Sequence, residues 1–238
     1  MAQRFAQYDS RGYRTLDVAA AYAAWAPSYD ATMDNHLDLP LLGSMASVDW
    51  NGVAVAVDLG CGTGRIGAWL KARGVHQVDG VDASAAMLQR AVAKGVYHRL
   101  IDADATATGL GCGHYDLAIS SFVACHLGDL SGFYAEAARL IRPRGCAVLV
   151  DYHPFMLLKG VPTHFKAPTG EPIAIANVVH LFSDHVAAAR SAGLTLMELR
   201  EQLVDAEWVR QNRLLFGEPR LESHLGHPVS FAMVWARD

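Results

Sequence analysis

The chain has 238 residues, of which 52% are hydrophobic, and its 20 basic and 24 acidic residues give a net charge of −4. This length and composition predict a large packed core and exclude a disordered chain. The sequence carries no basic stripe typical of nucleic-acid-binding proteins, and no stretch approaches the roughly 18 apolar residues that span a bilayer. The N-terminus is too polar for a signal peptide, and the four cysteines show no metal-ligand spacing. We therefore expect a cytoplasmic protein with reduced thiols and no bound metal.

Apolar runs and helical patterns alternate along most of the chain. Residues 53–57 predict a buried strand, and residues 65–71 predict a helix with its apolar residues on one face. Further strands are expected at residues 77–82, 97–101, 115–120, 146–151, 194–204 and 229–236, and further helices at residues 85–94, 130–141 and 184–193. No convincing helix separates the last two strands, which indicates an antiparallel hairpin. The predicted fold class is α/β, with a Rossmann-like seven-stranded sheet, mostly parallel with an antiparallel last strand, and helices on both faces.

Three segments fall outside this alternation. Residues 1–50 are rich in alanine and aromatic residues and predict an N-terminal helical cap. Residues 152–182 hold four of the nine prolines, and a structureless run of that length is typical of a lid or substrate insertion. Residues 205–228 form a second, smaller insertion. We expect all of them to belong to one domain over residues 1–238.

The stretch "VDLGCGTGRIGAWL", residues 57–70, places a glycine-rich turn between the first strand and the first helix of the sheet. Such a turn predicts a site for an anion or a nucleotide. Gly62 to Gly67 spell the G-x-G-x-x-G pattern of dinucleotide-binding proteins, and Asp82 follows at a suitable distance. Asp58, at the end of the strand, would repel a pyrophosphate and attract a ligand with an ammonium group.

The arrangement Asp58-Leu-Gly60-Cys-Gly62-Thr-Gly64 resembles the first motif of class I S-adenosylmethionine-dependent methyltransferases. The resemblance continues through "VDGVDAS", "DADAT", "HYDLAISSFVACHL" and "EAARLIRPRGCAVLVDY", and it covers roughly residues 50–152. It implies that S-adenosylmethionine is the cofactor and S-adenosylhomocysteine the product. It also implies that Asp82 holds the ribose hydroxyls, while Asp104 meets the adenine amino group and Ala105 the ring edge.

The cofactor site implied by this resemblance lies at the carboxyl ends of the first strands of the sheet. Its expected residues are Asp58, Gly60, Cys61, Gly62, Asp82, Ala83, Asp104, Ala105 and Ser120. The glycines would let the methionine end of the cofactor lie directly against the turn. The segment "AAAYAAWAPSYDATMD" is similar to a family helix whose tyrosines close over that end, which implies roles for Tyr22 and Tyr29. The alternative is that Tyr22, Trp25 and Tyr29 are an ordinary core stripe.

Histidines are the candidate general bases for proton removal near neutral pH. We expect His126, Tyr152 and His153 around the transferred methyl, with Phe155, Met156 and Phe165 as an apolar wall. His164, His180 and His185 are further candidates, and for each histidine a structural or surface role is the alternative. His224 and His227 are expected to be turn residues.

The acceptor is expected to be a small, partly apolar molecule and not a nucleic acid or a membrane. Nucleic-acid base methyltransferases carry an Asn/Asp-Pro-Pro-aromatic motif where this chain has Ser120-Ser121-Phe122-Val123. Oxygen, nitrogen and carbon acceptors all remain open. A NAD-dependent oxidoreductase and a non-catalytic adenosylmethionine-binding regulator are the two alternative functions, and we expect a monomer or a homodimer.

Overall fold

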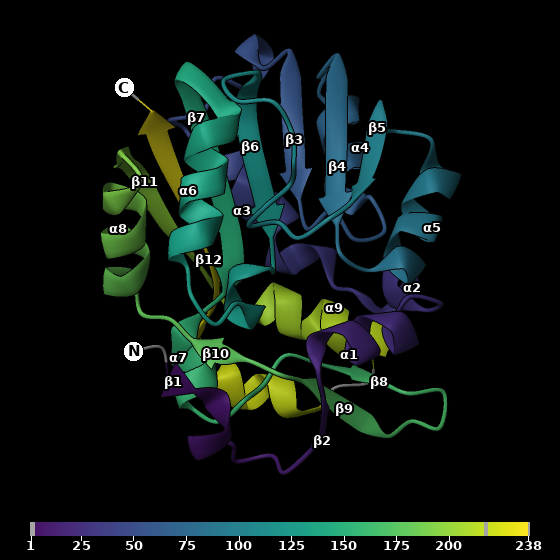
Figure 1. Cartoon of the computed structure of the whole chain (residues 1–238). Coiled ribbons are helices and arrows are strands. Elements are labelled where there is room, and N and C mark those ends of the chain that lie inside the picture. The colour runs from purple at the N-terminus through teal and green to yellow at the C-terminus, as the bar shows by residue number, and fades with distance from the viewer. Residues whose placement is uncertain (1–2, 217–218, 238) are drawn as a thin grey trace.

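The structure, a computed structural model, describes residues 3–216 and 219–237. Its main element is a seven-stranded sheet with the strand order β11-β12-β7-β6-β3-β4-β5 (Figure 1). The parallel strands are β3 (Val55–Leu59), β4 (Gln77–Asp82), β5 (Arg99–Asp102), β6 (Tyr115–Ser121) and β7 (Ile141–Tyr152). At the far edge, β12 (Pro228–Arg237) runs antiparallel to β7 and to β11 (Leu194–Leu203). The predicted fold class is confirmed.

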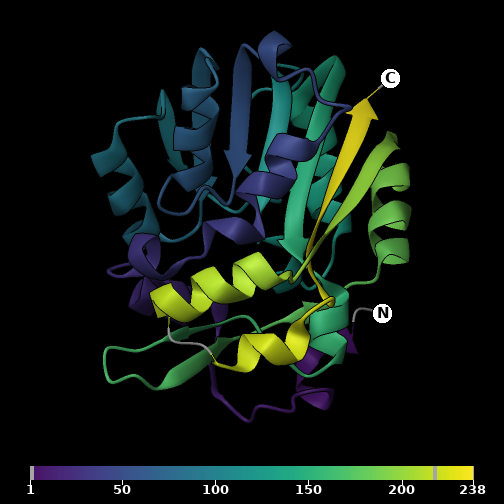
Figure 2. The same cartoon turned by 180° about the vertical axis from the view of Figure 1, so that it is seen from behind.

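Helices cover both faces of this sheet. α6 (Ser131–Leu140) and α8 (Phe182–Ser191) lie on the face toward the viewer in Figure 1, and α3 (Leu39–Ser44) and α4 (Arg65–Ala72) on the face seen in Figure 2. α5 (Ala85–Lys94) packs beside β4 and β5. Each face buries its own apolar cluster, with Tyr134 and Trp235 on the first and Leu42 and Leu70 on the second. This burial holds the carboxyl ends of the parallel strands in a fixed row.

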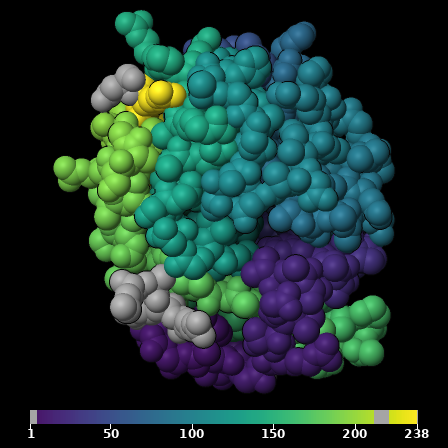
Figure 3. Space-filling model, viewed as in Figure 1, coloured from purple at the N-terminus to yellow at the C-terminus, as the bar shows by residue number. Residues whose placement is uncertain are grey.

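A second layer lies beneath those carboxyl ends, and we call it the cap (Figures 1 and 3). It contains a three-stranded sheet of β2 (Arg14–Leu16), β9 (Pro172–Ile175) and β8 (His164–Lys166), and a pair formed by β1 (Gln3–Arg4) and β10 (Val178–Val179). Its helices are α1 (Val18–Trp25), α2 (Tyr29–Thr32), α7 (Pro154–Leu158) and α9 (Ala206–Phe216), and a 3₁₀ helix spans Pro219–His224.

The cap corrects three expectations. Residues 152–182 are not structureless, because β8, β9 and β10 pair there with one another or with N-terminal strands. The N-terminal segment is helical only in part, because its first 16 residues contribute those partner strands. A helix, α9, does separate β11 from β12. It forms because Asp205 caps its start, accepting from the Trp208 amide at 2.7 Å, and because Trp208 and Val209 are buried among apolar residues of the cap.

Across the described ranges, 3–216 and 219–237, no helix combines the length and the hydrophobicity that crossing a membrane would need. Within the same ranges, no three or more His, Cys, Asp or Glu residues are grouped where they could hold a metal ion.

Candidate active site

The glycine-rich turn connects β3 to α4. Gly60, Gly62 and Gly64 have φ values of 73°, 53° and 89°, in the left-handed region that favours glycine. Gly67 serves packing instead, since a Cβ there would lie 2.4 Å from Cζ of Tyr97. Tyr97 therefore lies flat against the first turn of α4 and reaches the end of β3.

Asp58 lies at that strand end with its side chain fully buried. Its Oδ2 accepts a hydrogen bond from the Tyr97 hydroxyl at 2.6 Å, whereas its Oδ1 has no hydrogen-bond partner within the described part of the chain. Burial raises the pKa of this carboxyl to about 7, against the lowering effect of Tyr97, and the charge of Asp82 raises it further. A buried carboxylate with an unpartnered oxygen fits a site for the positively charged end of a ligand.

The raised pKa of Asp58 predicts a measurable dependence of stability on pH. The folded protein holds a proton on Asp58 up to about pH 7, whereas the unfolded chain releases it near pH 3.8, so ionisation destabilises the fold as pH rises toward 7. We expect cofactor-free Asp58→Asn protein to be more stable than wild type at pH 8 and to unfold at a higher temperature. The difference in unfolding free energy between the two proteins should be about 1 kcal/mol smaller at pH 6, where Asp58 of the wild type is protonated. A gain of equal size at both pH values, in thermal scans of the two proteins, would contradict the assignment.

Asp82 and Asp104 lie at the ends of the next two strands. The Asp82 carboxylate accepts from the backbone amide of Gly62 at 2.7 Å and from that of Ser84 at 2.8 Å, so it links the glycine turn to the start of α5. Each of its oxygens retains a lone pair for a further donor. Asp104 is exposed and uses Oδ1 to accept from the amide and hydroxyl of Thr106, both at 2.7 Å. Ala83 is exposed, and Ala105 is buried.

Several polar groups of the expected site are already engaged within the protein. The amides of Gly60 and Cys61 both donate to the carbonyl of Val81, at 2.8 and 2.9 Å. The Ser120 hydroxyl donates to the carbonyl of Leu59 at 2.8 Å and holds β6 against the end of β3. These contacts fix the shape of the turn, and a ligand lying on it would meet carbonyl groups and carboxylates.

Gly60 is also where the turn meets the segment that follows β6. A Cβ at Gly60 would lie 2.2 Å from Cγ2 of Val123. We expect Gly60→Ala to displace Val123 and to destabilise the protein by about 1–3 kcal/mol, measured by denaturant unfolding. Gly62→Ala is the matched control, because its nearest neighbour would be 3.8 Å away at a similar positive φ. Adding Val123→Ala to the Gly60 variant should recover part of the loss, and a double variant as unstable as the single one would rule out the steric cause.

A cavity of about 290 Å³ lies between the carboxyl ends of β6 and β7 and the cap. Aromatic side chains dominate its lining: Tyr13, Tyr22, Trp25, Tyr29, Phe122, Tyr152, Phe165 and Trp208. Met156 also lines it, so two of the three residues expected as an apolar wall are present, whereas Phe155 packs against His227. Tyr22 and Tyr29 are near the glycine turn as well: both pack in the apolar cluster that contains Met87, and Cε of Met87 would lie 3.8 Å from a Cβ at Gly62.

His126 faces Tyr22 in this cavity. Its Nδ1 lies 2.8 Å from the carbonyl of Ala176, and its Nε2 lies 3.0 Å from the Tyr22 hydroxyl. Because a carbonyl only accepts, Nδ1 carries the proton of the neutral ring, and Nε2 accepts from Tyr22. Burial lowers the pKa of His126 to about 4, so the ring is neutral at pH 7 with its basic nitrogen toward the cavity.

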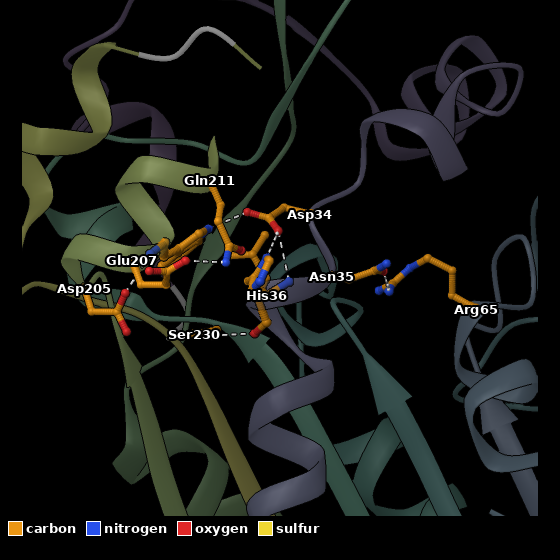
Figure 4. Close-up of polar contacts among 10 residues, drawn as sticks. Asp34, Asn35, His36, Arg65, Asp205, Glu207, Gln211 and Ser230 are labelled. Atoms are coloured by element: carbon orange, nitrogen blue, oxygen red, sulfur yellow. Dashed lines mark hydrogen bonds and ion pairs between the residues drawn. The ribbon is translucent and has the colours of Figure 1, made fainter. Parts of the chain in front are cut away.

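Asp34 and Asn35 form a short polar segment that contacts both a cavity-lining residue and α4, the helix after the glycine turn (Figure 4). Asp34 accepts from the indole N–H of Trp208 on α9 at 2.5 Å, which fixes this cavity-lining residue. The next residue, Asn35, accepts from Arg65 at the start of α4, and Arg65 is also paired with the buried Asp38. Arg65 is thus a structural cation that joins residues 35–38 to the start of α4, directly after the glycine turn.

His153 is not placed as expected. Its Nδ1 caps α7 by accepting from the Phe155 amide at 3.0 Å, and its Nε2 lies 2.8 Å from the Glu201 carboxylate. Its ring packs edge-on against Phe182 and Phe231, and it does not line the cavity that the described residues form. Both ring nitrogens are used in structural contacts, so His153 is removed from the candidate acceptor site.

The other expected residues divide between the cavity and the core. Tyr152 and His164 line the cavity. His180 donates to the Leu127 carbonyl at 2.8 Å, and His185 lies 2.9 Å from the Tyr134 hydroxyl in the core. His224, expected in a turn, ends a 3₁₀ helix and lines the cavity.

Phe122 and Arg11 are two of the cavity residues that were not assigned to the site from the sequence. Phe122 is buried and has a φ of 59°, which is a strained backbone conformation for a residue with a bulky side chain. Residues in such conformations cluster at functional sites. The position of Phe122, two residues after the expected end of the fourth strand, was the available signal. Arg11 lies in the N-terminal segment with no motif around it, and only the fold brings it to the cavity.

Comparisons with known proteins agree with this geometry. The family model described as a methyltransferase domain matches residues 57–149. An uncharacterized methyltransferase of Emericella nidulans is 29% identical over 87% of this chain and 85% of its own length. Malonyl-[acyl-carrier protein] O-methyltransferase of Salmonella typhimurium is 32% identical, over 54% of this chain and 50% of its own length.

Solved structures show the same fold. An S-adenosylmethionine-dependent methyltransferase from Mesorhizobium loti superposes with a TM-score of 0.63 at 22% identity, covering 83% of this chain and 96% of that one. The DhpI–SAH complex superposes with a TM-score of 0.62 at 17% identity, covering 91% and 93%. Residues 57–149 thus match a methyltransferase domain, and together with the glycine turn, the acidic strand ends and the strand order these similarities support a class I S-adenosylmethionine-dependent methyltransferase.

Proposed function

We propose that this methyltransferase methylates a small molecule bound in the aromatic cavity, and that His126 takes the proton of the acceptor. The observation that carries the proposal is the position of the cavity. Tyr22 and Tyr29 line it, and both pack in the apolar cluster with Met87, whose methyl group lies beside Gly62 of the turn. These two rings therefore lie between an acceptor in the cavity and the cofactor turn.

The residues around the turn fit S-adenosylmethionine. The unpartnered oxygen of Asp58 suits the ammonium group of the methionine end, and Asp82 suits the ribose hydroxyls. Oδ2 of Asp104 has no hydrogen-bond partner among the described residues and suits the adenine amino group, and Ala105 offers an apolar surface to the ring. The remaining proposed contacts are Gly60, Cys61, Gly62, Ala83 and Ser120, with Tyr22 and Tyr29 over the methionine end.

S-adenosylmethionine, when bound, supplies an electrophilic methyl group on a sulfonium that is its own leaving group. The protein then has to hold the acceptor in line and to remove a proton where the acceptor carries one. His126 is suited to this because its Nδ1 is fixed by Ala176 and its neutral Nε2 faces the cavity. An acceptor O–H or N–H that replaces the Tyr22 hydroxyl at Nε2 would pass its proton there.

Tyr152 has a positioning role in this proposal. Burial raises the pKa of its hydroxyl, so the group stays protonated and can donate a hydrogen bond to the acceptor. The cavity size is near the lower end of the range for small-molecule sites, and the cap forms its floor. Both features favour a small acceptor over a polymer. We further infer that residues 1–238 act as one domain, since N-terminal strands complete the sheets of the 152–182 insertion.

The test is a calorimetric titration followed by an activity screen. We expect S-adenosylhomocysteine to bind and NADH not to bind. Labelled S-adenosylmethionine should then transfer its methyl group to at least one member of a panel of small phenols, amines and carboxylic acids. Binding of NADH alone would favour the oxidoreductase alternative. Binding of S-adenosylhomocysteine with no transfer to a broad panel would favour the non-catalytic regulator.

A further inference from the structure

Arg11 is held at the cavity by a tightly built N-terminal loop. The Asp9 carboxylate accepts from the backbone amides of Arg11 at 2.9 Å and Gly12 at 3.1 Å, which closes a turn around Arg11. The preceding Ser10 is fastened to Gly160, whose carbonyl accepts from the Ser10 hydroxyl at 3.0 Å and from its amide at 3.2 Å. The loop therefore fixes the backbone from which Arg11 reaches the cavity.

The Arg11 guanidinium has one hydrogen-bond partner among the described residues. Its Nη2 donates to Nε2 of His224 at 3.2 Å, and no described carboxylate lies within ion-pair distance of it. A guanidinium has five N–H donors in a planar fork, so four of them are left for other partners. A partly buried cation without a counter-ion is energetically costly, which points to an anionic ligand.

The residues around Arg11 also favour an anionic ligand. His224 is buried, and its pKa is lowered first by burial and then by the charges of Arg11, His227 and Lys159. Since Arg11 only donates, His224 accepts at Nε2 and is neutral there. Asp34 is the acidic residue of the lining, and its carboxylate is already engaged with Trp208 and His36. The positive charge at this part of the cavity thus stays available.

We propose that Arg11 binds a carboxylate of the methyl acceptor, so that the substrate class is an aromatic or similarly apolar carboxylic acid. This inference rests on the proposed function, because the cavity is taken as the acceptor site. The planar guanidinium matches a carboxylate with two parallel hydrogen bonds, and the aromatic lining matches an apolar body. Lys166 also lines the cavity, so a phosphate, which brings a second negative charge, is the competing anion that the experiment has to exclude.

The experiment compares three probes with the same naphthalene body: 2-naphthoate, its uncharged isostere 2-naphthamide, and 2-naphthyl phosphate. Their affinities are measured by calorimetry or fluorescence, with and without S-adenosylhomocysteine. We expect naphthoate to bind wild-type protein at least tenfold more tightly than naphthamide. Arg11→Gln should remove this preference, and Arg11→Lys should keep only part of it because the ammonium lacks the fork. Arg14→Gln, which removes an exposed arginine of β2, is the matched control and should change nothing.

Equal affinity of wild type for naphthoate and naphthamide, or an unchanged preference in a folded Arg11→Gln protein, would overturn the inference. Naphthyl phosphate binding more tightly than naphthoate, with the same dependence on Arg11, would overturn it in favour of a phosphate. A different result, the binding of S-adenosylhomocysteine, tests the proposed function. If S-adenosylhomocysteine does not bind, the methyltransfer proposal is lost, while the naphthoate preference can still be measured on the cofactor-free protein.

Discussion

His126→Ala lowers kcat by about 10²–10⁴-fold and leaves the affinity for S-adenosylhomocysteine unchanged, if the ring is the general base. The variant removes the Nε2 lone pair that faces Tyr22 in the cavity. Tyr22 is also proposed to cover the methionine end of the cofactor, but its ring packs against Trp25 and should keep its place in the variant. His126→Gln should be impaired to a similar degree. A glutamine side chain can accept a hydrogen bond there, but it does not take a proton.

The measurement is methyl transfer to an acceptor identified in the panel, with cofactor affinity determined by titration. His153→Asn is the matched control, because asparagine can also cap a helix and His153 lies outside the cavity lining. The pH profile is a second readout. With the pKa of His126 at about 4, its base function is present above that pH and lost as pH falls through it. Full turnover of His126→Ala, or a rate that already halves near pH 6.5, would remove His126 from this role.

The main sheet could be predicted from sequence because each of its units is local. A buried strand, a turn and an amphipathic helix follow one another within 18 residues, from Val55 to Ala72 and again from Gln77 to Lys94. Parallel strand order follows from repeating this unit. The acidic residues Asp58, Asp82 and Asp104 could be predicted for the same reason, since each comes at or just after the end of a strand.

The cap could not be predicted because its pairings join distant segments. Strand β2, at Arg14–Leu16, pairs with Pro172–Ile175, more than 150 residues away, and each strand alone is too short to give a periodic pattern. The same limit applies to side chains. His126 and His153 each follow a strand, and only the packing around them separates a cavity residue from a helix cap.

Asp82→Ala weakens the binding of S-adenosylhomocysteine at least tenfold, and more if both ribose hydroxyls depend on it. Hydrogen bonds to a charged group contribute about 1.5–3 kcal/mol each, and 1.4 kcal/mol corresponds to a factor of ten. The variant also frees the amides of Gly62 and Ser84, which Asp82 holds at 2.7 and 2.8 Å, so the turn itself loses order. Asp82→Asn separates the two effects, because the amide oxygen can still hold one of these N–H groups while the charge is gone.

The matched control for this prediction is Asp102→Ala. Asp102 pairs in register with Asp82 on the neighbouring strand. Burial raises the pKa of Asp82, and the charge of Asp102 adds to that rise. Removing Asp102 takes away the same charge from the same edge of the sheet without touching the proposed ribose contact. Calorimetric titration of the three variants should therefore show weak binding for both Asp82 variants and near-normal binding for Asp102→Ala. If the dissociation constant of Asp82→Ala equals that of wild type, the ribose does not bind at the end of β4. The cofactor would then have to lie elsewhere along the row of strand ends.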